Sequence, residues 1–263
     1  MGKENIVQNG VIITLDKGLL ISYCKNMTIT ERQKDILNKI IEEYINYAQP
    51  VSSQLVEKRY DFGICPATIR IEMQRLTDAG YLCQPHTSAG RIPTDKGYRF
   101  FVNSLLEKGI DDFKDILEIE KIIQQEKENT LKFMGRLARF LSGASSELAM
   151  VYLFEKDFFW KEGWEEILLQ PEFNEKDFVI NFTNLLENFE EEKMANLRLM
   201  PGIKIYIGRE NPFPKARNFS IISSMCCLPE EGEAVFALFG PKRMDYDKNI
   251  SLIHSLTKAL EKF

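Results

Sequence analysis

The sequence is poor in the residues that build metal sites and covalent cross-links. Its 263 residues include 5 cysteines and 2 histidines, and no two cysteines form a C-x-x-C pair. A zinc site or a disulfide framework is therefore not expected, and we expect no metal and no cofactor. Unpaired cysteines are typical of a reducing compartment, so the sequence favours a cytoplasmic protein.

Long apolar runs and a strong charge are missing too. No stretch reaches the roughly 20 apolar residues of a membrane-spanning helix. Asp16 and Lys17 interrupt the apolar stretch of residues 11–23, which we therefore do not read as a signal peptide. The net charge of −5 argues against a protein that coats nucleic acid. A small DNA-binding module remains compatible with it, because residues 28–101 are close to neutral and the acidic excess follows them.

Catalytic motifs are absent as well. The sequence contains no nucleophile elbow and no phosphate-binding loop. Cys226 or Cys227 with His254 is the one nucleophilic pair to consider, and no orienting acid stands at a recognisable spacing. The two cysteines are neighbours in an expected strand, so they should point to opposite faces and serve packing. We do not expect an enzyme.

What the sequence does contain begins with three expected helices. Thr30 and Gln33 have the spacing of a capping box ahead of a helix with one apolar stripe. Ser52 or Ser53 can cap a short second helix. Pro66 suits the first position of a third, because its missing amide hydrogen would be unpaired there anyway.

A β-ribbon is expected after the third helix. Gly80 ends that helix, a strand should follow it, and residues 97–102 should form the return strand after a polar loop. Three helices closed by a β-ribbon are the pattern of a winged helix-turn-helix, a DNA-binding fold. We assign it to residues 28–102.

The third helix and the loop supply the candidate DNA contacts. Ile69, Met73 and Leu76 recur at i, i+4 and i+7 and should face the core, which leaves the opposite face open. Arginine suits a guanine edge or a phosphate, and a hydroxyl near a helix start can hold a phosphate. The residues expected to bind DNA are Thr68, Arg70, Ile71, Gln74, Arg75, His86, Thr87, Ser88 and Arg91.

Each of these candidates has a structural alternative. Arg70 and Arg75 could be solvated and bridged to Glu72 or Asp78, Thr68 could simply cap its helix, and the loop could be a solvated hairpin. Three further residues could reach phosphates, although the second is more typical of a core: Lys96, Tyr98 and Arg99.

The rest of the chain alternates between helices and strands. Residues 103–145 read as a charged helical connector, with Gly109 as a break. In residues 146–263 we expect strands at 148–154, 203–208, 219–228 and 234–240, and helices at 164–170, 175–194 and after Asp247. Residues 1–27 are an extension, either a loose strand or a leader that precedes the true start at Met27.

Several runs of residues carry a family resemblance. They are TERQKDILNKIIEEYI, QPVSS, PATIR, QPHTSAGRIPTDKGYRFFV, QPEF, IGRENPF and GPKRMDYDKNISLI. In these runs the chain resembles the HrcA family of heat-inducible transcription repressors. The resemblance is dense over residues 28–106 and resumes over 137–142 and from 167 onward.

The resemblance implies an α+β fold and a function. The fold would be an N-terminal winged helix-turn-helix, a helical connector and a reduced GAF-like α/β domain. The protein would be a repressor of chaperone operons that binds the inverted repeat called CIRCE as a homodimer and is released on heat stress. A GroEL-type chaperonin would keep it active.

The chain departs from the family pattern at three places. The segment between Ser146 and Trp164 is too short for the family's inserted dimerising domain. Ile71 stands where the family usually has Asn, and Cys65 where it has Ser. Asn can bind adenine through two hydrogen bonds, whereas Ile offers only apolar contact to a thymine methyl, so the operator bases could differ.

Two rival functions remain open from the sequence. The first is a winged-helix regulator that senses a small molecule through its GAF-like domain, which a pocket with several polar groups there would favour. The second is a winged helix that binds a protein partner, whose binding would be insensitive to salt and to DNA sequence.

Overall fold

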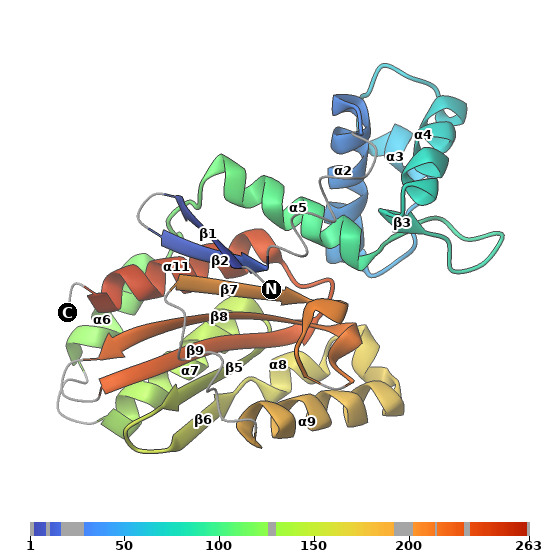
Figure 1. Cartoon of the computed structure of the whole chain (residues 1–263). Helices are drawn as coiled ribbons and strands as arrows, with labels where there is room; N and C mark the ends of the chain where they lie inside the picture. The colour runs from blue at the N-terminus through green and yellow to red at the C-terminus, as the bar shows by residue number, and fades with distance from the viewer. Residues whose placement is uncertain are drawn as a thin grey trace. The chain divides into compact units, whose positions relative to one another are not determined.

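The computed structural model describes residues 3–8, 11–16, 29–125, 130–191, 202–213, 215–228 and 232–261. It divides into two compact units: residues 29–108 belong to the first, and the residues from Gly109 onward, together with residues 3–15, belong to the second (Figure 1). Both units mix helices and strands, so the α+β class expected from the sequence is confirmed. The suggested start at Met27 lies outside the described residues. Ahead of it, β1 (Lys3–Gln8) and β2 (Val11–Asp16) form a two-stranded sheet of their own.

The first unit contains the three expected helices and a short ribbon. Its elements are α2 (Glu31–Tyr47), α3 (Ser53–Arg59), α4 (Pro66–Asp78), β3 (Leu82–Cys83), β4 (Ile92–Pro93) and α5 (Asp95–Lys108). The capping box at Thr30 is present. Of the two serines considered, Ser52 caps α3 by accepting a hydrogen bond from the Leu55 amide at 3.1 Å. Helix α4 starts at Pro66, as expected.

The return strand was predicted in the wrong place. Residues 97–102 lie in helix α5, and the strand that pairs with β3 is β4. The Thr94 hydroxyl accepts a hydrogen bond from the Gly97 amide at 3.2 Å, and Asp95 occupies the first helical turn, so this segment starts a helix. A Cβ at Gly97 would lie 2.4 Å from the Tyr81 carbonyl oxygen, which explains the glycine by close packing.

Helix α2 is the centre of the first core. Its stripe of Ile36, Leu37, Ile40 and Ile41 is fully buried, and α3, α4 and α5 all pack against it. This burial follows from the helical spacing of the apolar residues in the sequence. It also fixes which side of α4 faces inward.

The second unit is built on one antiparallel sheet whose strands lie in the order β6-β5-β9-β8-β7 (Figure 1). The strands are β5 (Leu148–Leu153), β6 (Phe158–Glu162), β7 (Gly202–Ile207), β8 (Phe219–Leu228) and β9 (Gly232–Pro241). The helices are α6 (Ile116–Gln125), α7 (Thr130–Ser145), α8 (Trp164–Leu168), α9 (Lys176–Glu191) and α11 (Tyr246–Glu261).

The sheet carries helices on both faces. Helix α11 packs on β8, and α7 packs on β5 and β6. A buried cluster joins alternate residues of β5 to aromatic side chains of α9, among them Phe182 and Phe189. Strand β5 is buried along its whole length, as expected of a strand covered on both sides.

Four expected strands of this unit are confirmed, and two predictions need correction. Strand β6 was not predicted, although it occupies the segment that was judged too short for an inserted domain. Helix α11 begins one residue before Asp247, and its start is capped by Asp245, whose carboxylate accepts from the Lys248 amide at 3.1 Å. Met194, the expected end of α9, lies outside the described residues. No helix in the described part of the chain combines the length and apolarity of a membrane span.

A buried carboxylate attaches α3 to α2. Arg59 Nη1 donates to Glu43 Oε2 at 2.5 Å, and the Tyr60 hydroxyl donates to Oε1 at 2.6 Å. Burial by itself would raise the pKa of the Glu43 carboxyl, but these hydrogen bonds outweigh it and hold the pKa below its usual range. The ionised form is therefore favoured by folding.

Because Arg59 and Tyr60 bind the ionised Glu43 carboxylate, we expect Glu43 to make a pH-dependent contribution to the stability of the first unit. A lowered pKa in the folded state stabilises the fold fully above the unfolded-state pKa of about 4.3, and this gain is lost as the pH falls through the folded value. Glu43→Gln should therefore lower the melting temperature at neutral pH, and the difference from wild type should shrink toward about pH 3. Thermal unfolding followed by circular dichroism measures it. Glu57→Gln, at an exposed glutamate of α3, is the matched control, and a difference that stays constant with pH would contradict the assignment.

Candidate nucleic-acid interface

Helix α4 has one buried and one open face. Ile69, Met73 and Leu76 are buried, as their spacing predicted. The opposite face is exposed along the helix and includes Arg70, Gln74 and Arg75. Ile71 lies in the middle of this face with 53% of its surface exposed.

Glu72 is a buried charged residue on α4, and it is paired on both oxygens. Gln33 Nε2 donates to Glu72 Oε2 at 2.7 Å, and Arg75 Nη1 donates to Oε1 at 2.9 Å. Gln33 also accepts from the Thr30 amide in the capping box of α2. A buried carboxylate needs such partners. Gln33 therefore joins α2 to α4, and Arg75 pairs with Glu72 within α4, as the structural alternative anticipated for it.

The wing is the polar loop between β3 and β4. Gln84 Nε2 donates to the carbonyl oxygens of Thr87 and Ala89, both at 2.9 Å, which closes the loop. The exposed residues at its tip are His86, Thr87 and Ser88. At its base, Arg91 and Val51 exchange two backbone hydrogen bonds of 2.8 and 2.9 Å.

The side chain of Arg91 connects the wing to α4. Its Nε donates to Thr77 Oγ1 at 3.1 Å, and its Nη2 donates to Gln74 Oε1 at 2.9 Å. Gln74 in turn donates to Asp78 Oδ1 at 2.8 Å. Arg91 and Gln74 were both expected to contact DNA, and that stays a prediction; in the structure the two side chains are bonded to each other and link the wing to α4.

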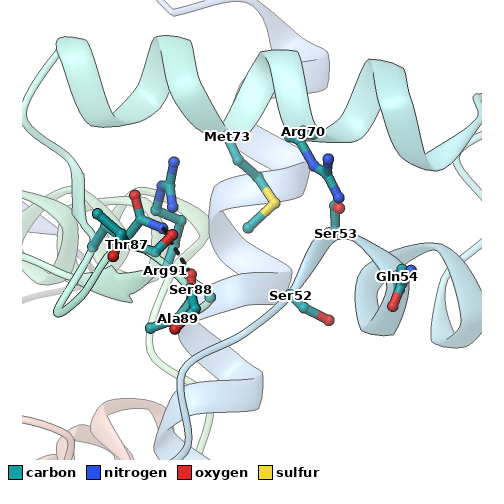
Figure 2. Close-up of a pocket in the computed structure, with 11 residues that line it drawn as sticks. Ser52, Ser53, Gln54, Arg70, Met73, Thr87, Ser88, Ala89 and Arg91 are labelled. Carbon is teal, nitrogen blue, oxygen red and sulfur yellow. Dashed lines mark hydrogen bonds between the residues drawn. The ribbon is translucent and has the colours of Figure 1, made fainter.

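A groove of about 550 Å³ separates the wing from the helices (Figure 2). Arg70 and Met73 enter it from α4, the start of α3 forms the second wall, and the wing forms the third. Arg70 makes no hydrogen bond or ion pair with any residue that the structure describes. The lining residues are Ser52, Ser53, Gln54, Arg70, Met73, Gln84, Thr87, Ser88, Ala89, Gly90 and Arg91.

Several lining residues were not among the sequence candidates. Ser53 and Gln54 lie at the start of α3, and Gln84 lies at the start of the wing. The helix-turn-helix pattern itself was the available signal, because it sets α3, the helix before the recognition helix, beside α4. The exposed amide of Gln54 suits a hydrogen bond to a phosphate oxygen. Ser53 is buried, and Gln84 already uses its Nε2 group to close the wing.

The segment after the wing has two of its three phosphate candidates in the core. Tyr98 and Arg99 are buried, so the interpretation that they reach phosphates is wrong. Lys96 Nζ donates to the Ala79 carbonyl at 2.8 Å and stands 4.3 Å from the centre of the Tyr81 ring. Burial lowers the pKa of Lys96.

Thr68 and Cys65 lie at the start of α4. Cys65 is the exposed N-cap residue, and its Sγ lies 3.4 Å from Thr68 Oγ1. This hydrogen bond, with help from backbone amides at the helix start, lowers the pKa of the Cys65 thiol. Thr68 therefore contacts the cap residue, and its partly exposed hydroxyl stays beside the open face of the helix.

The cysteine and histidine considered for catalysis lie in the second unit. Cys226 is buried and Cys227 is exposed, so they point to opposite faces, as predicted. Burial raises the pKa of the Cys226 thiol and lowers the pKa of His254. A thiol that resists ionisation makes a poor nucleophile. The described residues contain no group of three or more potential metal ligands.

A second polar cluster brings together two of the sequence runs that carry the family resemblance. Arg243 donates to both oxygens of Glu172, at 2.5 and 2.8 Å. Gln170 donates to the buried Glu147 at 3.1 Å, and burial raises the pKa of the Glu147 carboxyl. A Cβ at Gly240 would lie 1.8 Å from Glu147 Oε2. These contacts show why the runs around residues 170 and 240 belong to one structural feature.

Comparisons with known proteins give consistent results. The family model described as the HrcA protein C terminal domain matches residues 96–250. The heat-inducible transcription repressor HrcA of Desulfitobacterium hafniense is 29% identical over 338 aligned positions, covering 89% of this chain and 97% of the relative. That of Acetivibrio thermocellus is 39% identical over 130 residues, covering 49% of this chain and 37% of the relative.

Two further facts come from these comparisons. The 338 aligned positions exceed the 263 residues of this chain, so the Desulfitobacterium relative contains residues with no counterpart here. A crystal structure described only as that of a hypothetical protein superposes with a TM-score of 0.73 at 22% identity, covering 90% of this chain and 99% of that one. This second likeness supports the fold alone.

The backbone at the base of the wing leaves no room for a side chain at Gly90, so adding one methyl group there should destabilise the protein. A Cβ at Gly90 would lie 2.4 Å from the Val51 carbonyl oxygen and 2.8 Å from the Pro50 carbonyl carbon, and both are backbone atoms. Gly90→Ala should therefore lower the free energy of unfolding by about 1–3 kcal/mol. Urea unfolding followed by circular dichroism measures this. Gly143→Ala in α7 is the control, because a Cβ there meets nothing within 4 Å; equal effects of the two changes would refute the prediction.

Proposed function

The chain belongs to the HrcA family, and we propose from this premise that it is a sequence-specific DNA-binding repressor of heat-shock operons. The observation that carries the proposal is the open face of α4 beside the wing and the groove between them. In a winged helix-turn-helix, this helix enters the major groove. The relatives named above are heat-inducible transcription repressors.

The proposed contacts divide into those that touch DNA and those that hold the binding residues in place. Arg70 lacks a partner among the described residues, so it can bind a guanine edge or a phosphate without breaking an existing bond. Thr68 and the wing tip of His86, Thr87 and Ser88 would contact the backbone or the minor groove. Three residues would act mainly by fixing the geometry of α4 and the wing: Gln74, Arg75 and Arg91.

The proposed partners follow from the same premise. A homodimer would place two copies of α4 on an inverted repeat, with half-sites about one helical turn or a multiple of it apart. Heat would end repression by loss of the active dimer, and a GroEL-type chaperonin would otherwise keep the repressor active. Operator binding would take place in the cytoplasm. Some residues of the Desulfitobacterium relative have no counterpart in this chain. The dimer contact proposed here would therefore be formed by residues that this chain does contain.

DNA binding can be tested with the full chain. Fluorescence anisotropy should show at least about 10³-fold tighter binding to an inverted-repeat duplex of the CIRCE type than to a scrambled duplex, together with a clear loss of affinity as salt rises. Arg70→Ala should weaken specific binding by about 10- to 100-fold. The control is Arg139→Ala, an exposed arginine of α7 that lies outside the interface. Equal, salt-insensitive binding to both duplexes would instead support a protein-interaction module.

A further inference from the structure

The open face of α4 has an apolar centre with polar neighbours that are already bonded. Ile71 is followed one turn later by Gln74 and Arg75. Both ends of the Gln74 amide are engaged, the oxygen by Arg91 and the nitrogen by Asp78. Arg75 is paired with Glu72. These bonds hold both side chains in place and so restrict where their remaining N–H groups can point.

Ile71 can contact a base without breaking any bond. Its side chain has no donor or acceptor and is 53% exposed. Because it is β-branched and lies within a helix, its first side-chain torsion is already restricted, so contact would cost little additional side-chain entropy. Arg70, the residue before it, lines the groove beside the wing. Ile71 is therefore an exposed apolar side chain that lies between Arg70 on one side and the bonded Gln74 and Arg75 on the other.

The groups that each base exposes in the major groove limit which base Ile71 can contact favourably. Thymine alone presents a methyl group there, whereas the other bases present hydrogen-bond donors and acceptors. An apolar side chain pressed against those polar edges would remove their water without replacing its hydrogen bonds, which is unfavourable. Against a methyl group the same side chain gains apolar burial.

We propose that Ile71 is a specificity-determining residue that reads the 5-methyl group of one thymine in each half-site. The inference rests on the proposed DNA-binding function and deepens it. It names the base that the centre of α4 selects and the atom by which it is selected.

The test removes only the methyl group. Each thymine of an inverted-repeat duplex that the full chain binds in preference to a scrambled one is replaced, position by position, by deoxyuridine, which keeps the base pairing. One symmetric position should weaken binding by about fourfold per half-site, and so by on the order of tenfold when both halves are changed. Ile71→Ala should bind the unmodified duplex with a similar loss and should be insensitive to deoxyuridine at that position.

The control variant is Ile180→Ala. Ile180 is an isoleucine of similar exposure, 45%, on helix α9, and its replacement should leave the full deoxyuridine effect in place. Ile71→Val, which keeps a β-branched apolar side chain, should retain part of the effect. Equal melting temperatures of the variants and the wild type would confirm that each is folded.

The possible results test the DNA-binding function and the role of Ile71 separately. If the chain prefers the inverted repeat but no deoxyuridine position weakens binding, or if the effect persists in Ile71→Ala, the role of Ile71 is refuted and the repressor function stands. If the chain shows no preference for the inverted repeat, the proposed function and the role of Ile71 both fail. A deoxyuridine effect that disappears only in Ile71→Ala supports both.

Discussion

The orientation of α4 depends on one buried carboxylate, that of Glu72. A charge in this position is tolerable only when both oxygens are bonded, and the partners come from two helices: Gln33 on α2 and Arg75 on α4 itself. Gln33 also completes the capping box at the start of α2. The first turn of α2 and the middle of α4 therefore form one bonded network. The apolar stripes of the two helices set the same orientation, so polar and apolar packing agree.

The outward face of α4 follows from that orientation. Once Ile69, Met73 and Leu76 are buried, Arg70 and Ile71 are left on the open side. The wing is then set against the helix by Arg91, and its base is held by the backbone pairing with Val51. Binding groups that are fixed before the ligand arrives lose less entropy on binding. The first unit is thus organised as a preformed surface around Arg70 and Ile71.

Much of this could be predicted from local signals. The capping box at Thr30, the proline at the start of α4 and the helical spacing of its buried residues depend on near neighbours in the sequence, and all are confirmed. The return strand was predicted wrongly because an apolar stretch of residues 97–102 fits a strand or a buried helix. What decides between them is the Thr94 cap and the close approach of Gly97 to Tyr81. The engagement of Gln74 by Arg91 depends on a tertiary contact across 17 residues, which no spacing rule reports.

If α4 and the wing form the DNA-binding face, a bound operator should shield both of them, and hydrogen–deuterium exchange of the full chain can show this. The exchange is measured by mass spectrometry with and without a saturating inverted-repeat duplex, and with a scrambled duplex for comparison. We expect the inverted repeat to slow exchange in Pro66–Asp78 and in residues 84–91. Unchanged exchange in both segments, with protection confined to residues after Gly109 while the duplex is bound, would contradict it.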